Sequence, residues 1–437
     1  MSSHGDPAAD PLLVWLNGGP GCSSFDGFVY EHGPFSFTHG TGGKGVRVRE
    51  NPFSWSQAAS VLYIDSPSGV GFSFSTDASD YHVNDTRTAQ DLHAFLVRFL
   101  SERHPELASV PLFIGGESYA GVYVPMFARE VLRGNKMRRE GDPLLNLQGY
   151  MVGNGVTDPV FDGNALVPFA AGKSLIDQAL NRKLHAACGG NYWNATKGSA
   201  CEQALDEMDA VLAKLNIYDS LDICYHPADP ATGSRERTGV PLPRFFGRAW
   251  PLRANVKAGV IKTWPQLFEE LRRPAGARRS SPPCIDDSIA HAYLNRADVK
   301  AAFHVKPQLS WELCTARITY THDVESMLEI HRWLLLQGVN ALIYSGDHDM
   351  CVPHTGTEAW TSSLGLAQVE AWRPWLFADA QVAGYVKSFQ AADGAGGDGS
   401  GGKLTYATVM GAGHTVPQYK PKQSLEMLSA FLLGRPL

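Results

Sequence analysis

Short apolar runs recur along the first third of the chain, at intervals that suit the strands of a buried sheet. Four runs, near residues 12–16, 61–64, 111–115 and 147–153, are separated by loops and by stretches with helical periodicity. Continuous apolar runs of this length are typical of strands that are covered on both faces, and their alternation with helices is typical of a mostly parallel sheet. The pattern therefore predicts an α/β core.

This strand–helix rhythm is lost between about residue 160 and residue 315. The segment holds five of the seven cysteines, a helix-like stretch from Glu202 to Leu215, and loops rich in Pro, Arg and Gly. We interpret it as a cap inserted into the core. The expected organisation is thus a first core part (1–159), the cap (160–315) and a second core part (316–437).

The second core part again shows a helix followed by a strand. One helical face carries apolar residues from Val324 to Leu335 and ends at Gly338, and an apolar run follows at 341–344. A further strand is predicted at 405–410 and a final helix around 424–433. The Gly-rich stretch 391–402 is predicted to be a mobile loop.

A candidate nucleophile lies at the end of the third apolar run. Residues 116–121 read Gly-Glu-Ser-Tyr-Ala-Gly, and a helix-like stretch begins near Tyr119. A serine on a tight turn from strand to helix is the nucleophile elbow of α/β-hydrolases, in which Gly116 and Ala120 would relieve backbone crowding. Such a string can also be an ordinary turn, so the assignment of Ser118 depends on the rest of the chain.

The other two members of a catalytic triad should follow in the order acid, histidine. The run at 341–344 leads into a loop with Asp347 and Asp349, and the strand at 405–410 leads into a Gly-rich turn with His414. We favour Asp349 as the acid that orients the imidazole, because it lies further beyond the strand end. Asp347 is expected to tie the loop by hydrogen bonds.

The reaction of such a triad needs backbone N–H donors for the oxyanion. One donor should be Tyr119, the residue after the nucleophile. The loop after the first strand, Asn-Gly-Gly-Pro-Gly at residues 17–21, is expected to supply the second donor from Gly19.

These motifs together resemble the serine carboxypeptidases of the S10 type, and the resemblance extends from Pro11 to Leu437. The stretches at 23–34 and 347–353 are most similar to the plant-type carboxypeptidase I group. The resemblance implies an α/β-hydrolase fold with an inserted, largely helical cap, and a serine-type exopeptidase that needs no cofactor or metal. The motifs that carry it are Asn-Gly-Gly-Pro-Gly-Cys-Ser-Ser (17–24), Gly-Glu-Ser-Tyr-Ala-Gly (116–121), Gly-Asp-His-Asp (346–349) and Gly-His-Thr-Val-Pro (413–417).

The resemblance also implies a site for the terminal carboxylate of a peptide, made by Asn17, Gly18, Glu31 and Glu117. Ionised glutamates would repel that carboxylate. Burial and mutual repulsion raise the pKa of neighbouring glutamates, and a protonated glutamate can donate a hydrogen bond instead. We therefore expect activity on peptide or protein C-termini at acidic pH, falling as the glutamates ionise.

The seven cysteines, by the same resemblance, form three disulfides, Cys22–Cys314, Cys188–Cys201 and Cys224–Cys284, and leave Cys351 as a free thiol near the substrate pocket. Sequence alone cannot fix the connectivity, and reduced cysteines in a cytosolic enzyme are the alternative. Disulfides suit a secretory route to a vacuole, a lysosome-like compartment or the extracellular space. Glycosylation sequons begin at Asn84 and Asn194, although Asn84 could equally cap a helix.

Composition excludes some classes of function. The 437 residues carry a formal charge of −6, with no basic run that would suit nucleic acid and no apolar run long enough to span a membrane. Arginine-rich stretches at 227–239 and 272–283 are candidate sites for nicking of the cap. Members of the family begin with a signal peptide and a hairpin before the first strand, whereas the polar residues 1–10 lead into it directly, without a signal-peptide pattern. Either the sequence is incomplete, or edge strands are missing and the sheet edge is exposed.

Three other functions are possible for a chain with these motifs. An acyltransferase of this fold that uses an acyl-glucose donor would share the triad, but Glu117 and Ala120 favour a peptidase. A hydroxynitrile lyase is disfavoured by the intact 116–121 motif. A non-catalytic binding partner would be indicated by a missing triad residue, and none is missing. The preferred C-terminal residue is left open, as is a homodimer.

Overall fold

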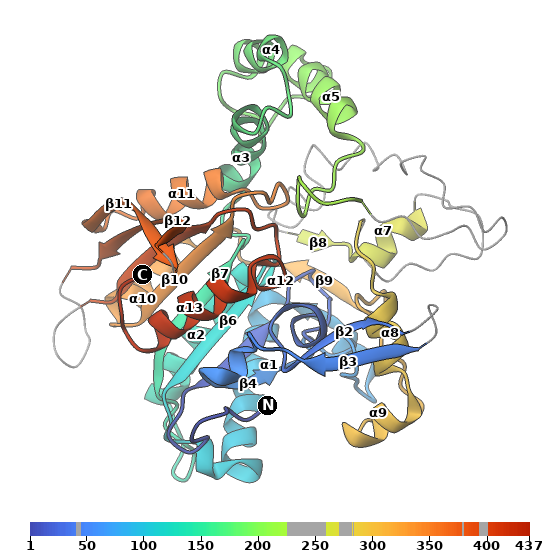
Figure 1. Ribbon diagram of the computed structural model, residues 1–437, viewed down its shortest axis with the longest axis vertical. Coiled ribbons are helices and arrows are strands. Elements are labelled where there is room, and N and C mark those ends of the chain that lie inside the picture. The colour runs from blue at the N-terminus through green and yellow to red at the C-terminus, as the bar shows by residue number, and fades with distance from the viewer. Residues whose placement is uncertain (41–44, 225–258, 271–281, 283, 378–379, 393–400) are drawn as a thin grey trace.

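The computed structural model of the chain (Figure 1) has a large central sheet with helices on both faces. The sheet contains eight strands in the order β11-β12-β13-β10-β7-β6-β1-β4. From β4 to β13, each strand is parallel to the next. At the other end of the sheet, β12 is antiparallel to β13, and β11 is antiparallel to β12. The residues that the structure describes are 1–40, 45–224, 259–270, 282, 284–377, 380–392 and 401–437.

The six strands predicted from apolar runs are all present, with ends within two residues of the prediction. They are β1 (Leu12–Leu16), β4 (Ser60–Tyr63), β6 (Leu112–Glu117), β7 (Leu147–Gly153), β10 (Asn340–Gly346) and β13 (Lys403–Val409). The α/β-hydrolase fold class is thereby confirmed. The sequence did not predict the antiparallel pair β11 (Ala367–Phe377) and β12 (Gln381–Gln390), whose pairing contains register shifts, or the hairpin of β2 (Phe35–His39) and β3 (Val46–Glu50).

Alternate residues of β1 enter two separate cores. Leu12, Val14 and Leu16 belong to the core on the side of α1 (Asp85–Arg98) and α2 (Ala120–Lys136). Leu13 and Trp15 belong to the core on the other side, which includes residues of α13 (Pro421–Leu432). Because successive strand residues point to opposite faces, a continuous apolar run is what a sheet covered by helices on both sides requires.

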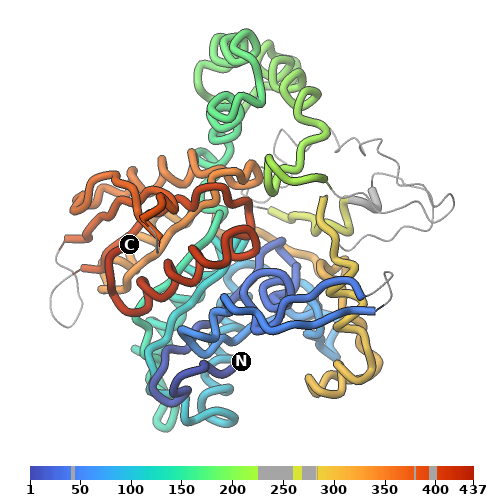
Figure 2. The backbone as a smooth tube through the Cα atoms, viewed as in Figure 1, coloured from blue at the N-terminus to red at the C-terminus, as the bar shows by residue number. Residues whose placement is uncertain are grey.

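The remaining described helices complete the two layers and the segment between the core parts. The helix predicted around residues 202–215 appears as α5, which begins and ends earlier. Figure 2 shows the green segment with α4 and α5 projecting away from the rest of the trace. The helices are α3 (Pro159–Gly172), α4 (Gln178–Cys188), α5 (Ala200–Leu212), α7 (Trp264–Glu270), α8 (Ser288–Leu294), α9 (Ala297–Ala302), α10 (Leu328–Leu336), α11 (His354–Ser363) and α12 (Val416–Tyr419).

Several one-turn helices and a small sheet connect these elements. The small sheet has the order β5-β9-β8, with β5 (His82–Asn84) parallel and β8 (Gly259–Ile261) antiparallel to β9 (Thr319–His322). It therefore joins a strand of the first core part to a strand of the segment interpreted as the cap. The short helices are the π-helices Gly27–Glu31 and Phe99–Arg103 and the 3₁₀-helices Trp55–Gln57, Ala78–Tyr81 and Pro105–Leu107.

Helix α10 begins later than its apolar face predicted, at Leu328 instead of Val324. The backbone N–H groups of Asp323 and Val324 donate to the Asp85 carboxylate, at 2.8 and 3.4 Å. This tertiary contact holds the chain in an extended form where local periodicity alone favoured a helix.

The sheet edge at β4 is partly covered by the first residues of the chain. Met1 and Val61 exchange two hydrogen bonds, from the Met1 ammonium to the Val61 carbonyl at 2.9 Å and from the Val61 N–H to the Met1 carbonyl at 2.8 Å. The Ser3 N–H donates to Ser60 Oγ at 3.1 Å. At these positions the backbone of β4 has hydrogen-bond partners, so this part of the edge is paired and not exposed as the sequence predicted.

Three disulfides join the pairs that the resemblance implied. They are Cys22–Cys314, Cys188–Cys201 and Cys224–Cys284, with sequence separations of 292, 13 and 60. Cross-links of this kind stabilise a fold chiefly by restricting the unfolded chain. Within the described parts of the chain, the structure has no helix with the length and apolar character that a bilayer crossing demands. The nicking candidates lie almost wholly outside the described residues, as does most of the Gly-rich loop.

Candidate active site

Ser118 sits on a sharp turn between β6 and α2. Its φ angle is +61°, in the left-handed region that non-glycine residues rarely adopt, and its side chain is partly exposed. A Cβ atom at Gly116 would lie 2.5 Å from the Leu16 carbonyl oxygen, and one at Gly121 would lie 2.3 Å from the carbonyl oxygen of Val156. The backbone of the turn therefore lies in close contact with neighbouring backbone, as predicted for a nucleophile elbow.

His414 and Asp349 lie side by side at the ends of β13 and β10. His414 Nδ1 is 2.8 Å from Asp349 Oδ2. The Asp349 carboxylate is fully buried and also accepts the backbone N–H groups of Cys351 at 2.7 Å and Val352 at 3.1 Å. These bonds fix the orientation of the carboxylate, and hence the tautomer and the orientation of the ring that it contacts.

Asp347 has a different environment from that of Asp349. Its Oδ1 accepts the Gly411 N–H at 2.7 Å, and its Oδ2 lies 3.6 Å from Lys173 Nζ. It ties the loop after β10 to the turn after β13, which is the role that the sequence suggested for it.

The segment interpreted as the cap also contacts His414. The His414 N–H donates to the Tyr218 carbonyl oxygen at 2.7 Å, and the two rings are 5.2 Å apart. A Cβ atom at Gly413 would lie 2.4 Å from the same carbonyl oxygen. Sequence reasoning did not single out Tyr218, because no motif surrounds it and its partner lies almost 200 residues away.

The glycine loop after β1 rests on the elbow. A Cβ atom at Gly18 would lie 2.4 Å from the backbone nitrogen of Tyr119 and 2.9 Å from Ser118 Cβ. Gly19 has φ +116°, and a Cβ atom there would lie 2.8 Å from the backbone nitrogen of Cys22. Only glycine allows this approach, and it brings the two predicted oxyanion donors, Gly19 and Tyr119, into adjoining segments.

Asn17 joins the two glutamates predicted to bind a carboxylate. Its Nδ2 donates to Glu31 Oε1 at 2.8 Å and to Glu117 Oε1 at 3.0 Å. The amide is oriented by Trp15 Nε1 and the Gly27 N–H, which donate to its Oδ1 at 3.0 and 3.2 Å. With both donors bound to Oδ1, the Nδ2 donors must face the two carboxyl groups.

Both glutamates resist ionisation. Burial is the main cause, and it raises the pKa of Glu31 to about 7 even though hydrogen bonds from Asn17 and Glu117 lower it. Burial and the charge of Glu31 raise the pKa of Glu117 well above its usual value. Glu117 is therefore the carboxyl group that holds its proton more firmly, and Glu31 is the one that titrates near neutrality.

A third acid, Asp26, faces this pair and was not among the predicted site residues. One carboxylate oxygen from each of Asp26, Glu31 and Glu117 lies within 4.8 Å of the other two. Burial and the charge of Glu31 raise the pKa of Asp26 well above its usual value. Three ionised acids could hold a cation, but the raised pKa values favour protonated groups that donate hydrogen bonds. The short spacing from Asp26 to Glu31 could have suggested the contact.

The remaining predicted site residues are also located by the structure. Cys351 is buried, has no disulfide partner, and has its thiol pKa raised by burial and by the charge of Asp349. Asn194 is exposed. Asn84 caps α1, its Oδ1 accepting the Arg87 N–H at 2.7 Å, which leaves its Nδ2, the atom that glycosylation modifies, outside the cap bond.

Comparison with known proteins identifies the class. The family model described as serine carboxypeptidase matches residues 1–434. The chain is 44% identical to serine carboxypeptidase 1 of Hordeum vulgare, covering 100% of this chain and 86% of the relative. It is 45% identical to serine carboxypeptidase-like protein 20 of Arabidopsis thaliana, covering 99% and 86%. The chain belongs to the serine carboxypeptidase family.

A solved structure supports the fold. The prohormone-processing carboxypeptidase KEX1(Δ)P of Saccharomyces cerevisiae superimposes with a TM-score of 0.68 at 22% identity, covering 99% of this chain and 85% of that one. The chain is accordingly a serine-type hydrolase of the carboxypeptidase class, on an α/β-hydrolase fold.

Proposed function

We propose that this protein releases C-terminal amino acids from peptides through an acyl-enzyme at Ser118, and that it works best at acidic pH. The observation that carries the proposal is the conjunction of a buried Asp349–His414 pair with a buried pair of glutamates that share Asn17. The first pair suits activation of a serine, and the second suits recognition of a free terminal carboxylate.

In this mechanism, Ser118 Oγ attacks the last peptide carbonyl while His414 accepts the serine proton. The N–H groups of Gly19 and Tyr119 hold the oxyanion of the tetrahedral intermediate. His414 then donates its proton to the leaving amino acid, and water hydrolyses the acyl-enzyme by the reverse sequence of proton transfers. Asp349 orients the imidazole and stabilises its charged form.

The terminal carboxylate of the substrate would bind to Asn17, Gly18, Glu31 and Glu117. With Glu31 and Glu117 protonated, their hydroxyls donate to it; with Glu31 ionised, the negative charges repel one another. Because the pKa of Glu31 is raised to about 7, substrate affinity is present below neutrality and is lost as the pH rises through that value.

The first experiment is release of free amino acid from N-blocked dipeptides near pH 5. The wild type is expected to release the C-terminal residue, Ser118→Ala is expected to release none, and the same peptides with an amidated C-terminus are expected to be poor substrates. Cleavage of the amidated peptides at equal rates would contradict the carboxylate-binding role. No release by a folded wild type would contradict peptidase activity, and transfer from an acyl-glucose donor would identify an acyltransferase instead.

We also propose that the protein passes through the secretory pathway to a vacuole-like or extracellular site, with glycans on Asn84 and Asn194. Three disulfides and the exposure of Asn194 support this. Residues 160–315 are proposed to act as a cap over the pocket, with residues 1–159 and 316–437 forming the core. Glycosidase treatment of the protein from its source would reveal glycans as a loss of mass, and sedimentation would show whether it forms a homodimer.

A further inference from the structure

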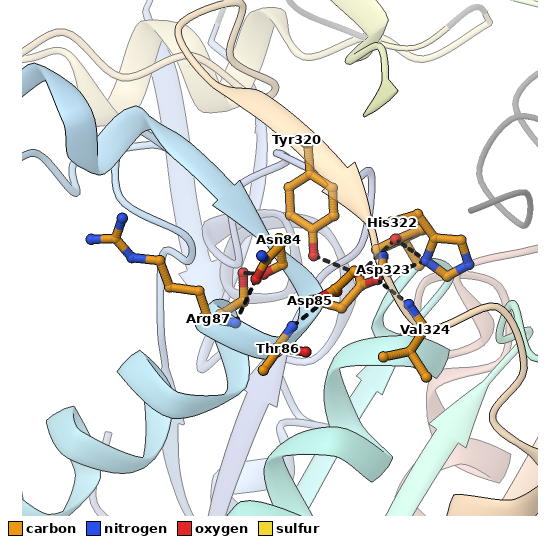
Figure 3. Close-up of polar contacts among 10 residues, drawn as sticks. Asn84, Asp85, Thr86, Arg87, Tyr320, His322, Asp323 and Val324 are labelled. Atoms are coloured by element: carbon orange, nitrogen blue, oxygen red, sulfur yellow. Dashed lines mark hydrogen bonds and ion pairs between the residues drawn. The ribbon is translucent and has the colours of Figure 1, made fainter. Parts of the chain in front are cut away.

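A further buried carboxylate, outside the candidate active site, lies behind the elbow and contacts the Tyr119 side chain. Asp85 is the first residue of α1, and its side chain has no exposure to solvent. Figure 3 shows it surrounded by residues of β9 and of the segment that follows β9. Its neighbours come from parts of the chain that are 34 to 239 residues away in sequence.

Besides the more distant Val324 N–H, four donors lie within 2.8 Å of this carboxylate. Oδ1 accepts the hydroxyls of Tyr119 at 2.7 Å and Tyr320 at 2.8 Å. Oδ2 lies 2.8 Å from His322 Nδ1 and accepts the Asp323 N–H at 2.8 Å. Burial alone would raise the pKa of Asp85, but these hydrogen bonds and the charge of His322 lower it below its usual value. The Asp85 carboxylate is therefore ionised, and both of its oxygens accept hydrogen bonds. We call Asp85 together with Tyr119, Tyr320, His322 and Asp323 the Asp85 hub.

The Tyr119 side chain is held along its whole length. Its hydroxyl lies 2.9 Å from His322 Nδ1 in addition to its bond with Asp85, and its ring packs edge-on against those of Tyr123, Tyr320 and His322. Only 1% of the residue is exposed. Tyr119 directly follows the serine with φ +61°, and its backbone N–H is one of the two donors predicted for the oxyanion.

We propose that Asp85 is a positioning residue for the reaction: it anchors the Tyr119 side chain so that the Tyr119 N–H stays aimed at the oxyanion. The inference rests on the proposed function through the oxyanion role of that N–H. An oxyanion donor acts only within a narrow range of distance from the developing charge. A left-handed serine also needs surrounding contacts to hold it in place, and an ionic hydrogen bond at the far end of the adjoining side chain supplies one.

The discriminating variant is Tyr119→Phe, which removes the bond to Asp85 and keeps the ring. Its matched control is Tyr150→Phe, because Tyr150 is equally buried and its hydroxyl lies 2.8 Å from a different histidine, His331. Each substitution deletes one buried tyrosine–histidine contact, but only the first touches the residue after the nucleophile. Asp85→Asn, alone and combined with Tyr119→Phe, tests whether the two positions act as one unit.

We expect Tyr119→Phe to lower kcat about 10-fold and change KM less than about 2-fold, a fraction of the 10²–10³-fold effect of losing an oxyanion donor. Binding of a peptide aldehyde, which forms a tetrahedral adduct, should weaken by a similar factor, whereas binding of the N-blocked product should not change. Asp85→Asn should give the same pattern, and the double variant should fall no further. Tyr150→Phe should keep kcat within about 2-fold while losing thermal stability comparably.

A third readout keeps this test separate from that of the proposed function. The rate at which a fluorophosphonate labels Ser118 depends on the nucleophile and the oxyanion hole, but not on recognition of a peptide carboxylate. If the wild type is labelled yet releases no amino acids, the proposed function fails and the labelling rates still test the hub. Tyr119→Phe labelled as fast as Tyr150→Phe would overturn the inference, and so would a folded wild type that is not labelled. Should Asp85→Asn fail to fold, Tyr119→Phe decides.

Discussion

Two buried acidic sites flank the same elbow, and their pKa values are shifted in opposite directions. Asp85 and the pair of Glu31 with Glu117 are almost equally buried, yet the pKa of Asp85 is lowered whereas those of the glutamates are raised. Burial acts in the same direction on all three. The difference is in the neighbours. Asp85 has five donors, among them His322, whose charge also lowers the pKa, whereas Asn17 supplies one nitrogen to both glutamates.

The comparison teaches that burial alone does not set the charge of these acids, because hydrogen bonds and the charge of His322 lower the pKa of Asp85 against the effect of burial. The Asp85 carboxylate, with donors on both oxygens and the charge of His322 beside it, is a rigid ionic anchor. A carboxyl pair short of donors keeps its protons and can offer them to a ligand. The first arrangement suits positioning, and the second suits binding of an anion.

The largest effect is expected from Asp349→Asn, which tests the role of a buried acid that accepts several hydrogen bonds. Asp349 resembles Asp85 in accepting several fixed donors, but its partner is the candidate catalytic histidine. We expect kcat to fall by about 10³–10⁴-fold, because an amide no longer holds the imidazole in the required tautomer. Steady-state kinetics on an N-blocked dipeptide would measure this. Asp347→Asn is the control, and an equal loss in that variant would refute the assignment of the acid.

A second test removes the charge from the Asp85 hub. Asp85→Asn should lower the free energy of unfolding near neutral pH by about 3 kcal/mol, since it breaks a buried ionic group. Because the folded-state pKa of Asp85 is lowered, its contribution is present above the unfolded value near 4 and is lost as the pH falls toward the folded value. Denaturant unfolding between about pH 2 and pH 7 should therefore show the two proteins converging in acid; a constant difference would contradict an ionised Asp85.

A third test concerns the two glutamates, which have few hydrogen-bond donors, and it measures how their ionisation affects substrate binding. In the wild type, KM is expected to rise about 10-fold between about pH 5 and pH 8.5 as Glu31 ionises near pH 7. Glu31→Gln keeps a donor that cannot ionise, so its KM should change less than about 2-fold over the same range. A wild-type KM that is flat across neutrality would show that the titration of Glu31 does not govern binding.

The smallest effect is expected on stability in alkali. A carboxyl group with a raised folded-state pKa has its favourable contribution below the unfolded value, and loses it as the pH rises through the folded value. Glu31→Gln is therefore expected to be about 1 kcal/mol more stable than the wild type near pH 8.5 and nearly equal near pH 4. Thermal unfolding at the two pH values would show this, and a variant less stable in alkali would contradict it.

The sequence predicted those parts of the structure that short motifs determine. The elbow at Ser118, the glycine loop at Gly18 and the parallel strands depend on local residue type, and the structure has them where expected. The preference for Asp349 over Asp347 rested on distance from the strand end, and the structure places Asp349 against His414.

The features that the sequence did not predict depend on contacts between distant segments. Asp85 reads as the middle residue of a sequon at a helix start, and its partners lie on β6–α2 and on β9. Tyr218 contacts His414 although almost 200 residues separate the two in sequence. The edge strands β11 and β12 have mixed exposure and shifted pairing, so neither a continuous apolar run nor strict alternation marks them.

The hub at Asp85 also has a consequence for how the protein is made on the ribosome. The nucleophile and its strand are synthesised early, but Tyr320, His322 and the Asp323 N–H emerge about 200 residues later. Until then, Tyr119 is the one donor already synthesised of the five that contact this carboxylate, and burying the carboxylate would be costly. The elbow should therefore mature only after β9 has left the exit tunnel, so nascent chains halted before that strand should remain substrates for chaperones and quality-control proteases.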